Sequence, residues 1–209
     1  AKRMNAKIKR DIDPVNNDGI TLIPQAMSIV ADEVIDLHRQ LVPYGYDEIN
    51  VNLGCPSGTV VSKKRGSGIL AYPDMLDSFL DELYTKADFP VSIKTRVGFN
   101  DDELWPKLIE IYSKYPISEL TVHPRVQKDF YKNTPRMDDF ALAVQKINPD
   151  KTILCYNGDI TDANSFKALT DRFPDIDEIM IGRGLFTNPA LIAELKGISM
   201  GKAELCKRL

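Results

Sequence analysis

The sequence has little of what membrane, secreted or zinc proteins need. Within its 209 residues no apolar run approaches the ~20 residues of a membrane-spanning helix. No charged-then-apolar secretion signal is visible at its start. The three cysteines, Cys55, Cys155 and Cys206, form no CxxC pair and no zinc-ligand spacing. We therefore expect a protein of the reduced cytoplasm, with no membrane partner and no metal site.

An excess of positive charge is also missing. The net charge is −3, so the chain as a whole does not attract nucleic acid, and any RNA binding must use local basic patches. Hydrophobic residues make up 43% of the sequence, which is enough to bury the core of one domain or of most of one. The first ten residues are basic and polar and lack an initiator methionine. We expect the chain to begin inside a longer protein.

Short apolar, β-branched runs alternate with helical stretches along most of the chain. The runs predict strands at Ile20–Gln25, Glu48–Asn52, Val91–Arg96, Leu120–His123, Thr152–Tyr156 and Glu178–Ile181. Apolar residues at helical spacing predict helices over Ala31–Leu41, Pro73–Tyr84, Asp101–Tyr112, Asp138–Ile147 and Ala163–Arg172. Candidate N-terminal caps are Asp32, Asp74, Asp101 and Thr161.

This alternation predicts βαβ units and a parallel sheet. A closed (β/α)8 barrel of the TIM type needs eight strands, whereas six are visible, so the first strands would be missing from an incomplete barrel. An open, doubly wound sheet fits six strands equally well on counting alone.

Polar residues stand where each predicted strand ends. The endings are Gln25, Asn52–Pro56, Lys94–Arg96, His123–Arg125, Asn157–Asp159 and Gly182–Gly184. In parallel β/α folds the carboxyl ends of all strands lie on one face, and active sites form there. We therefore expect these six endings to converge on one mouth.

The residue types at these endings suit a phosphorylated heterocyclic ligand. Small residues around Arg183 let backbone amides approach a phosphate, and the arginine complements its charge. Lys94 can stabilise a developing anion, and Gln25 can both donate to and accept from a planar ring. Cys55 stands at the rim, where a protonated thiol can act as a general acid or as a latent nucleophile. Each residue alone has an ordinary explanation, and a lone cysteine is usually a small buried hydrophobe. The joint placement carries the hypothesis.

Six motifs resemble those of tRNA-dihydrouridine synthases, in the family's own order from about residue 20 to about residue 194. The motifs are Ile49–Pro56, with its Asn-x-Gly-Cys-Pro turn, the basic loop Lys63–Gly68, the lysine strand Pro90–Arg96, the histidine strand Leu120–Arg125, and the two flavin-phosphate segments Tyr156–Ile160 and Met180–Gly184. The resemblance implies an FMN enzyme that reduces the C5–C6 bond of specific tRNA uridines, with NADPH as the reductant.

By position, the resemblance makes Cys55 the proton donor to C5 and Asn52 the residue that orients the target base. The residues implied to hold FMN are Gln25, Lys94, His123, Asn157, Gly158, Asp159, Gly182 and Arg183. The basic residues expected to meet the polyanionic tRNA are Lys64, Arg65 and Arg125. We expect a monomer.

The resemblance also divides the chain. It implies a connecting segment over 1–19, a partial FMN-binding barrel over 20–197, and over 198–209 the start of a helix leading towards a C-terminal helical domain that lies outside the chain. Two alternatives stay open. One is another FMN barrel that acts on a small pyrimidine, of the dihydroorotate or dihydropyrimidine dehydrogenase kind, and the other is a tRNA-binding fragment without catalysis.

Overall fold

The chain folds around a parallel sheet whose strands follow one another in sequence order. The computed structural model describes residues 4–198, and its sheet has the order β1-β2-β3-β4-β5-β6 with every neighbouring pair parallel. The strands are β1 (Gln25–Ala26), β2 (Ile49–Leu53), β3 (Val91–Gly98), β4 (Glu119–Val126), β5 (Ile153–Tyr156) and β6 (Glu178–Ile179). A doubly wound sheet would reverse its strand order at a switch point. The predicted incomplete barrel of six strands is therefore confirmed, and the doubly wound alternative is wrong.

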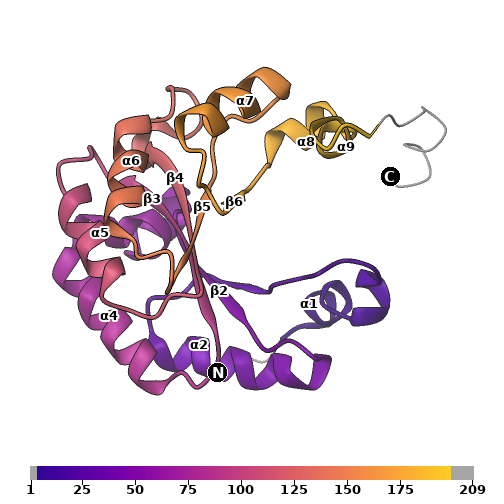
Figure 1. The fold of residues 1–209 in the computed structure, drawn as a ribbon. Coiled ribbons are helices and arrows are strands. Elements are labelled where there is room, and N and C mark those ends of the chain that lie inside the picture. The colour runs from indigo at the N-terminus through magenta and orange to yellow at the C-terminus, as the bar shows by residue number, and fades with distance from the viewer. Residues whose placement is uncertain (1–3, 199–209) are drawn as a thin grey trace.

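Helices cover the outer face of the sheet (Figure 1). The main ones are α2 (Ala31–Leu41), α4 (Pro73–Lys86), α5 (Trp105–Ser113), α6 (Met137–Lys146) and α7 (Ala163–Arg172). They confirm the five predicted helices, and the bounds of α2 and α7 match the prediction to the residue. Nothing helical within residues 4–198 is long and apolar enough to cross a membrane.

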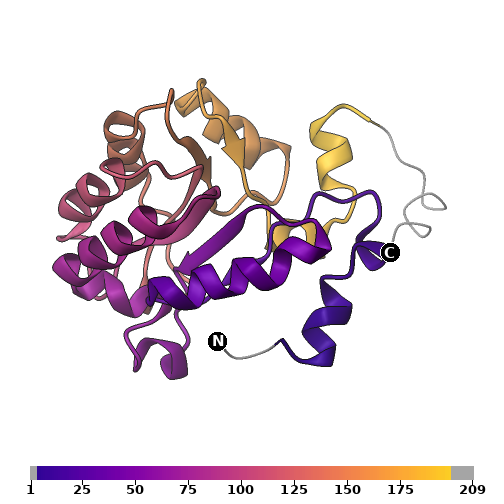
Figure 2. The same cartoon turned by 90° about the horizontal axis from the view of Figure 1, so that it is seen from below.

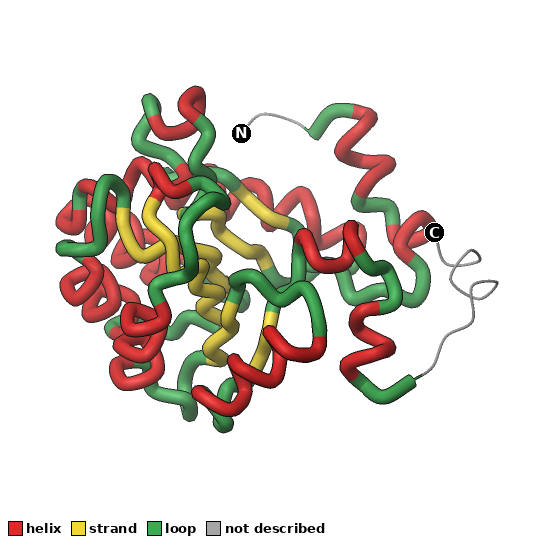
Figure 3. The backbone as a smooth tube through the Cα atoms, turned by 90° about the horizontal axis from the view of Figure 1, so that it is seen from above, coloured by secondary structure: helices red, strands yellow, loops and turns green. Residues whose placement is uncertain are grey.

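Shorter helical pieces complete the fold. They are α1 (Ala6–Asp11), α3 (Gly58–Val61), α8 (Arg183–Thr187) and α9 (Leu191–Leu195), with 3-10 turns η1 (Pro14–Asn17), η2 (Val42–Tyr44), η3 (Gly66–Ala71) and η4 (Gln127–Asp129). Figures 2 and 3 show α1 and the α8–α9 pair on the same side of the molecule, away from α4 and α5. The expected connecting segment 1–19 thus contains α1 and η1. The helix expected over 198–209 lies outside the described residues, apart from Ile198.

Two local predictions are wrong. The expected strand Ile20–Gln25 pairs only at its last residue, where Gln25 faces Asn50, and the ladder then runs on to Ala26. Ile20 is 65% exposed, and Pro24 has no N–H to give to a ladder, so apolar composition alone misplaced this edge strand.

The helix caps are the second error. Val30, Tyr72 and Leu104 precede α2, α4 and α5 without a side-chain cap bond. Asp162, and not Thr161, accepts from the backbone of α7.

The two faces of the sheet differ in polarity. Ile49, Val51 and Leu53 of β2 are fully buried and belong to the hydrophobic core, which lies between the sheet and the helices. Between them, Asn50 and Asn52 turn to the inner face, because side chains along a strand alternate. Neighbouring strands continue this polar inner row with Ser92, Lys94, Thr121 and Cys155, which pair in register. Helix packing therefore stabilises the outer face, and the inner face is left to polar chemistry.

Candidate active site

A cleft of about 680 Å³ opens at the carboxyl ends of the strands. Its size lies within the range of roughly 300–1,000 Å³ that is usual for small-molecule sites. Ten of the thirteen residues that the sequence singled out line it. They are Gln25, Asn52, Cys55, Lys94, His123, Asn157, Gly158, Asp159, Gly182 and Arg183. The predicted convergence of strand endings is confirmed, whereas the individual roles of these residues stay predictions.

Cys55 stands on the turn formed by residues 52–55, called the thiol turn below. Hydrogen bonds to its backbone hold this turn from two sides. Asn52 Oδ1 accepts from the backbone N–H of Gly54 at 3.0 Å and of Cys55 at 2.9 Å. On the other side, the backbone N–H and the hydroxyl of Ser67 both donate to the carbonyl oxygen of Cys55, at 3.0 and 2.8 Å. The thiol is half-buried on the cleft wall. The turn therefore fixes where the thiol stands relative to a ligand in the cleft.

A chain of amides joins this turn to the edge of the sheet. Asn52 Nδ2 donates to Gln25 Oε1 at 2.7 Å, and Gln25 Nε2 donates to Asn50 Oδ1 at 2.7 Å. Asn50 Nδ2 then donates to the hydroxyl of Ser92 at 3.1 Å. The oxygen of Asn52 is thus committed to shaping the thiol turn. Its predicted contact with a substrate base would use the side-chain nitrogen.

Lys94 brings a cation into the floor of the cleft. Its ammonium donates to Asn157 Oδ1 at 2.7 Å, and Asn157 Nδ2 donates to the carbonyl of Met180 at 2.9 Å. Burial, and next the charge of Arg96, lowers the pKa of Lys94 to about 8. The side chain is therefore protonated at neutral pH, and its hydrogen bond to Asn157 directs it across the sheet.

A second cationic group lies towards β5 and α8. Asp159 accepts from Arg125 and from Arg183. Although burial opposes it, this pairing holds the pKa of Asp159 below its ordinary value. Burial, followed by the charges of Arg96 and Lys94, lowers the pKa of His123 to about 2. The imidazole is therefore neutral, whereas Arg183, 54% exposed, can still approach an anion.

The three basic residues expected to meet tRNA do not line the cleft. Lys64 is exposed, with its ammonium 4.4 Å from the centre of the Tyr72 ring. Arg65 donates to both carboxylate oxygens of Glu33 on α2, at 3.1 and 2.9 Å. Arg125 is 1% exposed, so its predicted contact with a phosphate of a large polyanion is not possible in this structure. Its neighbours Asp159 and His123 take up its guanidinium instead.

Seven further residues line the cleft, and two of them, Arg96 and Tyr131, carry polar side chains that were not assigned from the sequence. Arg96, 2% exposed, donates to the carbonyls of Gly54, Val126 and Phe130 and so ties the thiol turn to the loop after β4. It lies two residues after Lys94 on the same strand face, and this spacing could have revealed it. Tyr131, half exposed, has its ring 4.9 Å from the guanidinium carbon of Arg183. It comes from a loop, where no periodicity gives a signal.

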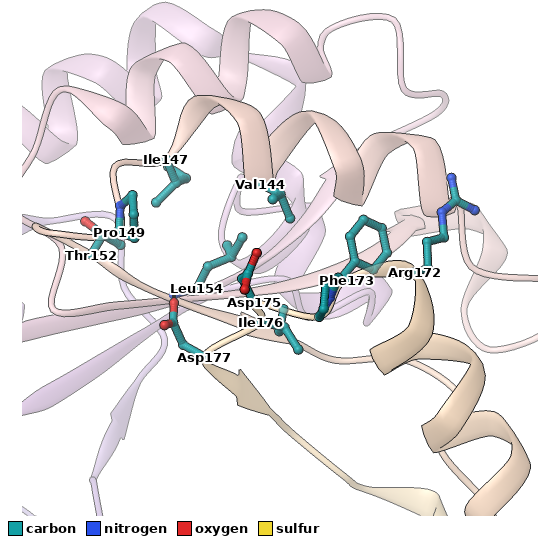
Figure 4. Close-up of a pocket in the computed structure, with 11 residues that line it drawn as sticks. Val144, Ile147, Pro149, Thr152, Leu154, Arg172, Phe173, Asp175, Ile176 and Asp177 are labelled. Atoms are coloured by element: carbon teal, nitrogen blue, oxygen red, sulfur yellow. Dashed lines mark hydrogen bonds between the residues drawn. The ribbon is translucent and has the colours of Figure 1, made fainter.

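A smaller pocket of about 220 Å³ lies away from this cleft (Figure 4). Its apolar lining comes from the end of α6, the end of α7 and the start of β5, with Val144, Phe173 and Leu154 among the residues drawn. The carboxyl end of β5 contributes to the cleft, whereas this pocket meets the amino end of the same strand. None of the residues singled out from the sequence lines it.

Comparison with known proteins gives a consistent family. A family model described as dihydrouridine synthase (Dus) matches residues 6–206. A probable tRNA-dihydrouridine synthase of Staphylococcus aureus is 33% identical over 154 residues, which cover 72% of this chain and 46% of that protein. For tRNA-dihydrouridine synthase B of Pasteurella multocida, the identity is 30% over 168 residues, covering 80% and 49%. The chain thus spans about half the length of the curated relatives it matches.

Solved structures support the fold. A 2,3-dimethylmalate lyase, a member of the PEP mutase/isocitrate lyase superfamily, superposes with a TM-score of 0.53 at 14% identity. The match covers 96% of this chain and 74% of the lyase. At that identity the similarity concerns the fold alone.

Proposed function

Because this chain belongs to the dihydrouridine synthase family, we propose that its cleft is the active site of a flavin-dependent tRNA-dihydrouridine synthase. The observation that carries the proposal is the meeting of the Cys55 thiol with two cationic groups in one cleft, Lys94 on one strand and Arg183 beyond another. This combination suits a reaction in which a proton donor and a phosphorylated, redox-active heterocycle must lie side by side.

The donor set fits FMN. Gln25, Lys94 and His123 present an amide, an ammonium and a neutral imidazole to the cleft, which match the carbonyl and nitrogen acceptors of a flavin ring. At the other end, a Cβ added to Gly182 would meet nothing within 4 Å, so the backbone there leaves room for a phosphate. Arg183, next in the chain, supplies the complementary charge. Asp159 would not touch the phosphate itself, because it holds Arg183 in place.

The proposed reaction adds a hydride at C6 and a proton at C5 of uracil. Reduced FMN, when bound, would supply the hydride, whose two electrons come ultimately from NADPH. The chain supplies the proton: the S–H bond of Cys55 breaks as the C5–H bond forms, and the thiolate is reprotonated from solvent. Asn52 holds the thiol at the cleft wall through its two backbone bonds, and Lys94 offers a positive charge to the electron-rich ring system.

The substrate we propose is a uridine turned out of folded tRNA, since a base inside the stack cannot reach the cleft. Lys64 is exposed on the loop beside the thiol turn, where it would meet a phosphate of the tRNA. We propose that residues 20–197 form the flavin-binding barrel unit and that the protein works as a cytoplasmic monomer.

Visible absorption tests the cofactor part of this proposal. The purified chain, mixed with FMN and freed of excess by gel filtration, should retain flavin bands near one equivalent. Lys94→Met should retain clearly less, because it removes the ammonium from the floor. Flavin retained by neither protein would overturn the proposal for this chain.

A tRNA reduction assay tests the thiol. With unmodified tRNA and NADPH, Cys55→Ala should lose dihydrouridine formation while keeping bound flavin and tRNA. The matched control is Cys155→Ala, which removes a buried thiol of β5 that does not line the cleft. Equal activity of the two variants would remove Cys55 from the reaction. Reduction of free uracil, with none of tRNA, would instead favour a dehydrogenase of small pyrimidines.

A further inference from the structure

Arg125 is buried, and its contacts differ from those of a surface arginine that binds a phosphate. Its guanidinium donates to both carboxylate oxygens of Asp159, and its Nε donates to the carbonyl of Asn133. Its remaining contact is with His123, whose Nε2 lies 3.0 Å from Arg125 Nη1. Because only 1% of its side chain is exposed, Arg125 can affect a cofactor only indirectly, through the residues that it holds.

The contact with His123 dictates where the imidazole proton sits. A guanidinium has only donors, so the nitrogen facing it must accept. Nε2 of His123 therefore carries no proton, and the neutral ring keeps its single N–H on Nδ1. An imidazolium, with a proton on each nitrogen, would place an N–H against the N–H of Arg125.

Nδ1 of His123 opens to the cleft. No hydrogen bond to this atom is found among the described residues. Within these residues, the buried side-chain atom that lacks a hydrogen-bond partner is Asp139 Oδ2, so Nδ1 of His123 is not a buried atom without a partner. Solvent in the cleft therefore reaches Nδ1, since the residue lines that cleft. The charges around the ring are Lys94 and Arg96 from β3, Arg125 from its own strand and Arg183 from α8. Asp159 lies beyond Arg125, and the Tyr131 ring stacks at 6.2 Å.

We propose that Arg125 is a positioning residue that fixes His123 as the Nδ1–H tautomer, so that His123 presents a hydrogen-bond donor to an acceptor atom of the flavin. The inference rests on the proposed function for the identity of the acceptor, but not for the tautomer. Burial and the surrounding cations support it, because they lower the pKa of His123 and keep the ring neutral throughout the physiological range. Asp159 in turn orients Arg125, so Asp159, Arg125 and His123 are held in place before a ligand binds.

Nitrogen-15 NMR of the full chain tests the tautomer directly. The sequence has two histidines, His38 and His123, so the spectrum is simple and the variant His38→Gln assigns it. We expect His123 to show a protonated Nδ1 and an unprotonated Nε2 from pH 8 down to pH 5. A proton on Nε2, or an imidazolium at pH 6, would overturn the inference.

Two variants and a control test the part played by Arg125. Arg125→Met should let the Nε2–H tautomer or the imidazolium appear and should weaken FMN binding about tenfold, the effect of one well-placed hydrogen bond. Arg125→Lys keeps a donor and a charge, so it should restore most of the tautomer preference. Arg172→Met is the matched control, because Arg172 also pairs with an aspartate, Asp138, but outside the cleft.

The outcomes separate this inference from the proposed function. If the wild-type chain shows the Nδ1–H tautomer but never retains FMN, the proposed function fails and the role of Arg125 towards His123 stands. If Arg125→Met folds and keeps both the tautomer and the FMN affinity of the wild type, the positioning role is wrong. If Arg125→Met does not fold, the wild-type spectrum and Arg125→Lys still decide.

Discussion

Replacing Gly66 by alanine should move the thiol turn, and a second glycine provides the control. The backbone of Gly66 has φ +54°, and a Cβ there would lie 2.7 Å from the carbonyl oxygen and 2.9 Å from the Cβ of Cys55. Gly45 has a similar left-handed backbone, with φ +84°, but a Cβ there would meet nothing within 4 Å. The two substitutions therefore share the backbone strain, and only one of them presses on Cys55.

The expected magnitudes follow from these contacts. A left-handed backbone costs a residue with a Cβ roughly 1–2 kcal/mol. Restricting the unfolded chain returns about 0.4–1 kcal/mol, so Gly45→Ala should lose about 1 kcal/mol of stability. Gly66→Ala adds overpacking of about 1–3 kcal/mol, because the backbone of Cys55 must shift and strain its bonds with Ser67. We expect a total loss of about 3 kcal/mol.

Urea unfolding measures the stability of both variants, and mass spectrometry of the Cys55 peptide follows its alkylation by iodoacetamide. Alkylation of Cys55 should change severalfold in Gly66→Ala and stay at the wild-type rate in Gly45→Ala. Equal losses of stability in the two variants, with alkylation unchanged in both, would refute the packing of Gly66 against the thiol turn.

Two further predictions concern pH. Because the pKa of Lys94 falls to about 8 on folding, from an ordinary 10.5, the unfolded chain binds the extra proton between these values and stability rises with pH across them. The expected rise in the free energy of unfolding is about 2 kcal/mol between pH 8 and 10, measured by urea unfolding, and Lys94→Met should lack it. If the stability of the wild type and of the variant changes with pH in parallel, the burial of the charge is contradicted. Burial, and next the neighbouring Asp102, raises the pKa of Asp139 to about 7, so the stability it contributes is complete near pH 4 and is lost as the pH rises through 7. At pH 8, Asp139→Asn should therefore be more stable than the wild type, with a free energy of unfolding in urea higher by about 1–2 kcal/mol after solvent screening. At pH 4.5 it should show no such gain. A gain of equal size at both pH values would count against the raised pKa of Asp139.

Much of this arrangement could be predicted from the sequence because parallel strands carry their own geometry. Once residues 91–96 and 120–123 are assigned to strands, Lys94 and His123 must point to the same mouth. The helical periodicity of residues 31–41 predicts α2 equally well, because its apolar residues form one stripe on the helix that must be buried. These rules need no knowledge of partners distant in the sequence.

The partners of charged side chains could not be predicted in this way. Arg125, Arg65 and Lys64 look alike in the sequence, yet one is buried against Asp159, one is paired with Glu33 and one is exposed. Asp159 lies 34 residues after Arg125, and nothing local links them. The difference arises from desolvation and pairing, which only the folded neighbourhood determines.

The lengths of the strands affect how the protein behaves at high concentration. The outermost strands of the sheet, β1 and β6, have two residues each, whereas the eight-residue strands β3 and β4 lie in its middle with a partner on both sides. An exposed strand edge presents free amides and carbonyls that template pairing with another molecule, and very short edge strands reduce this hazard. The two margins of this sheet offer very short runs, so fibril growth has little to extend from. The longest and most β-prone segments become available for aggregation only when the centre of the sheet unfolds.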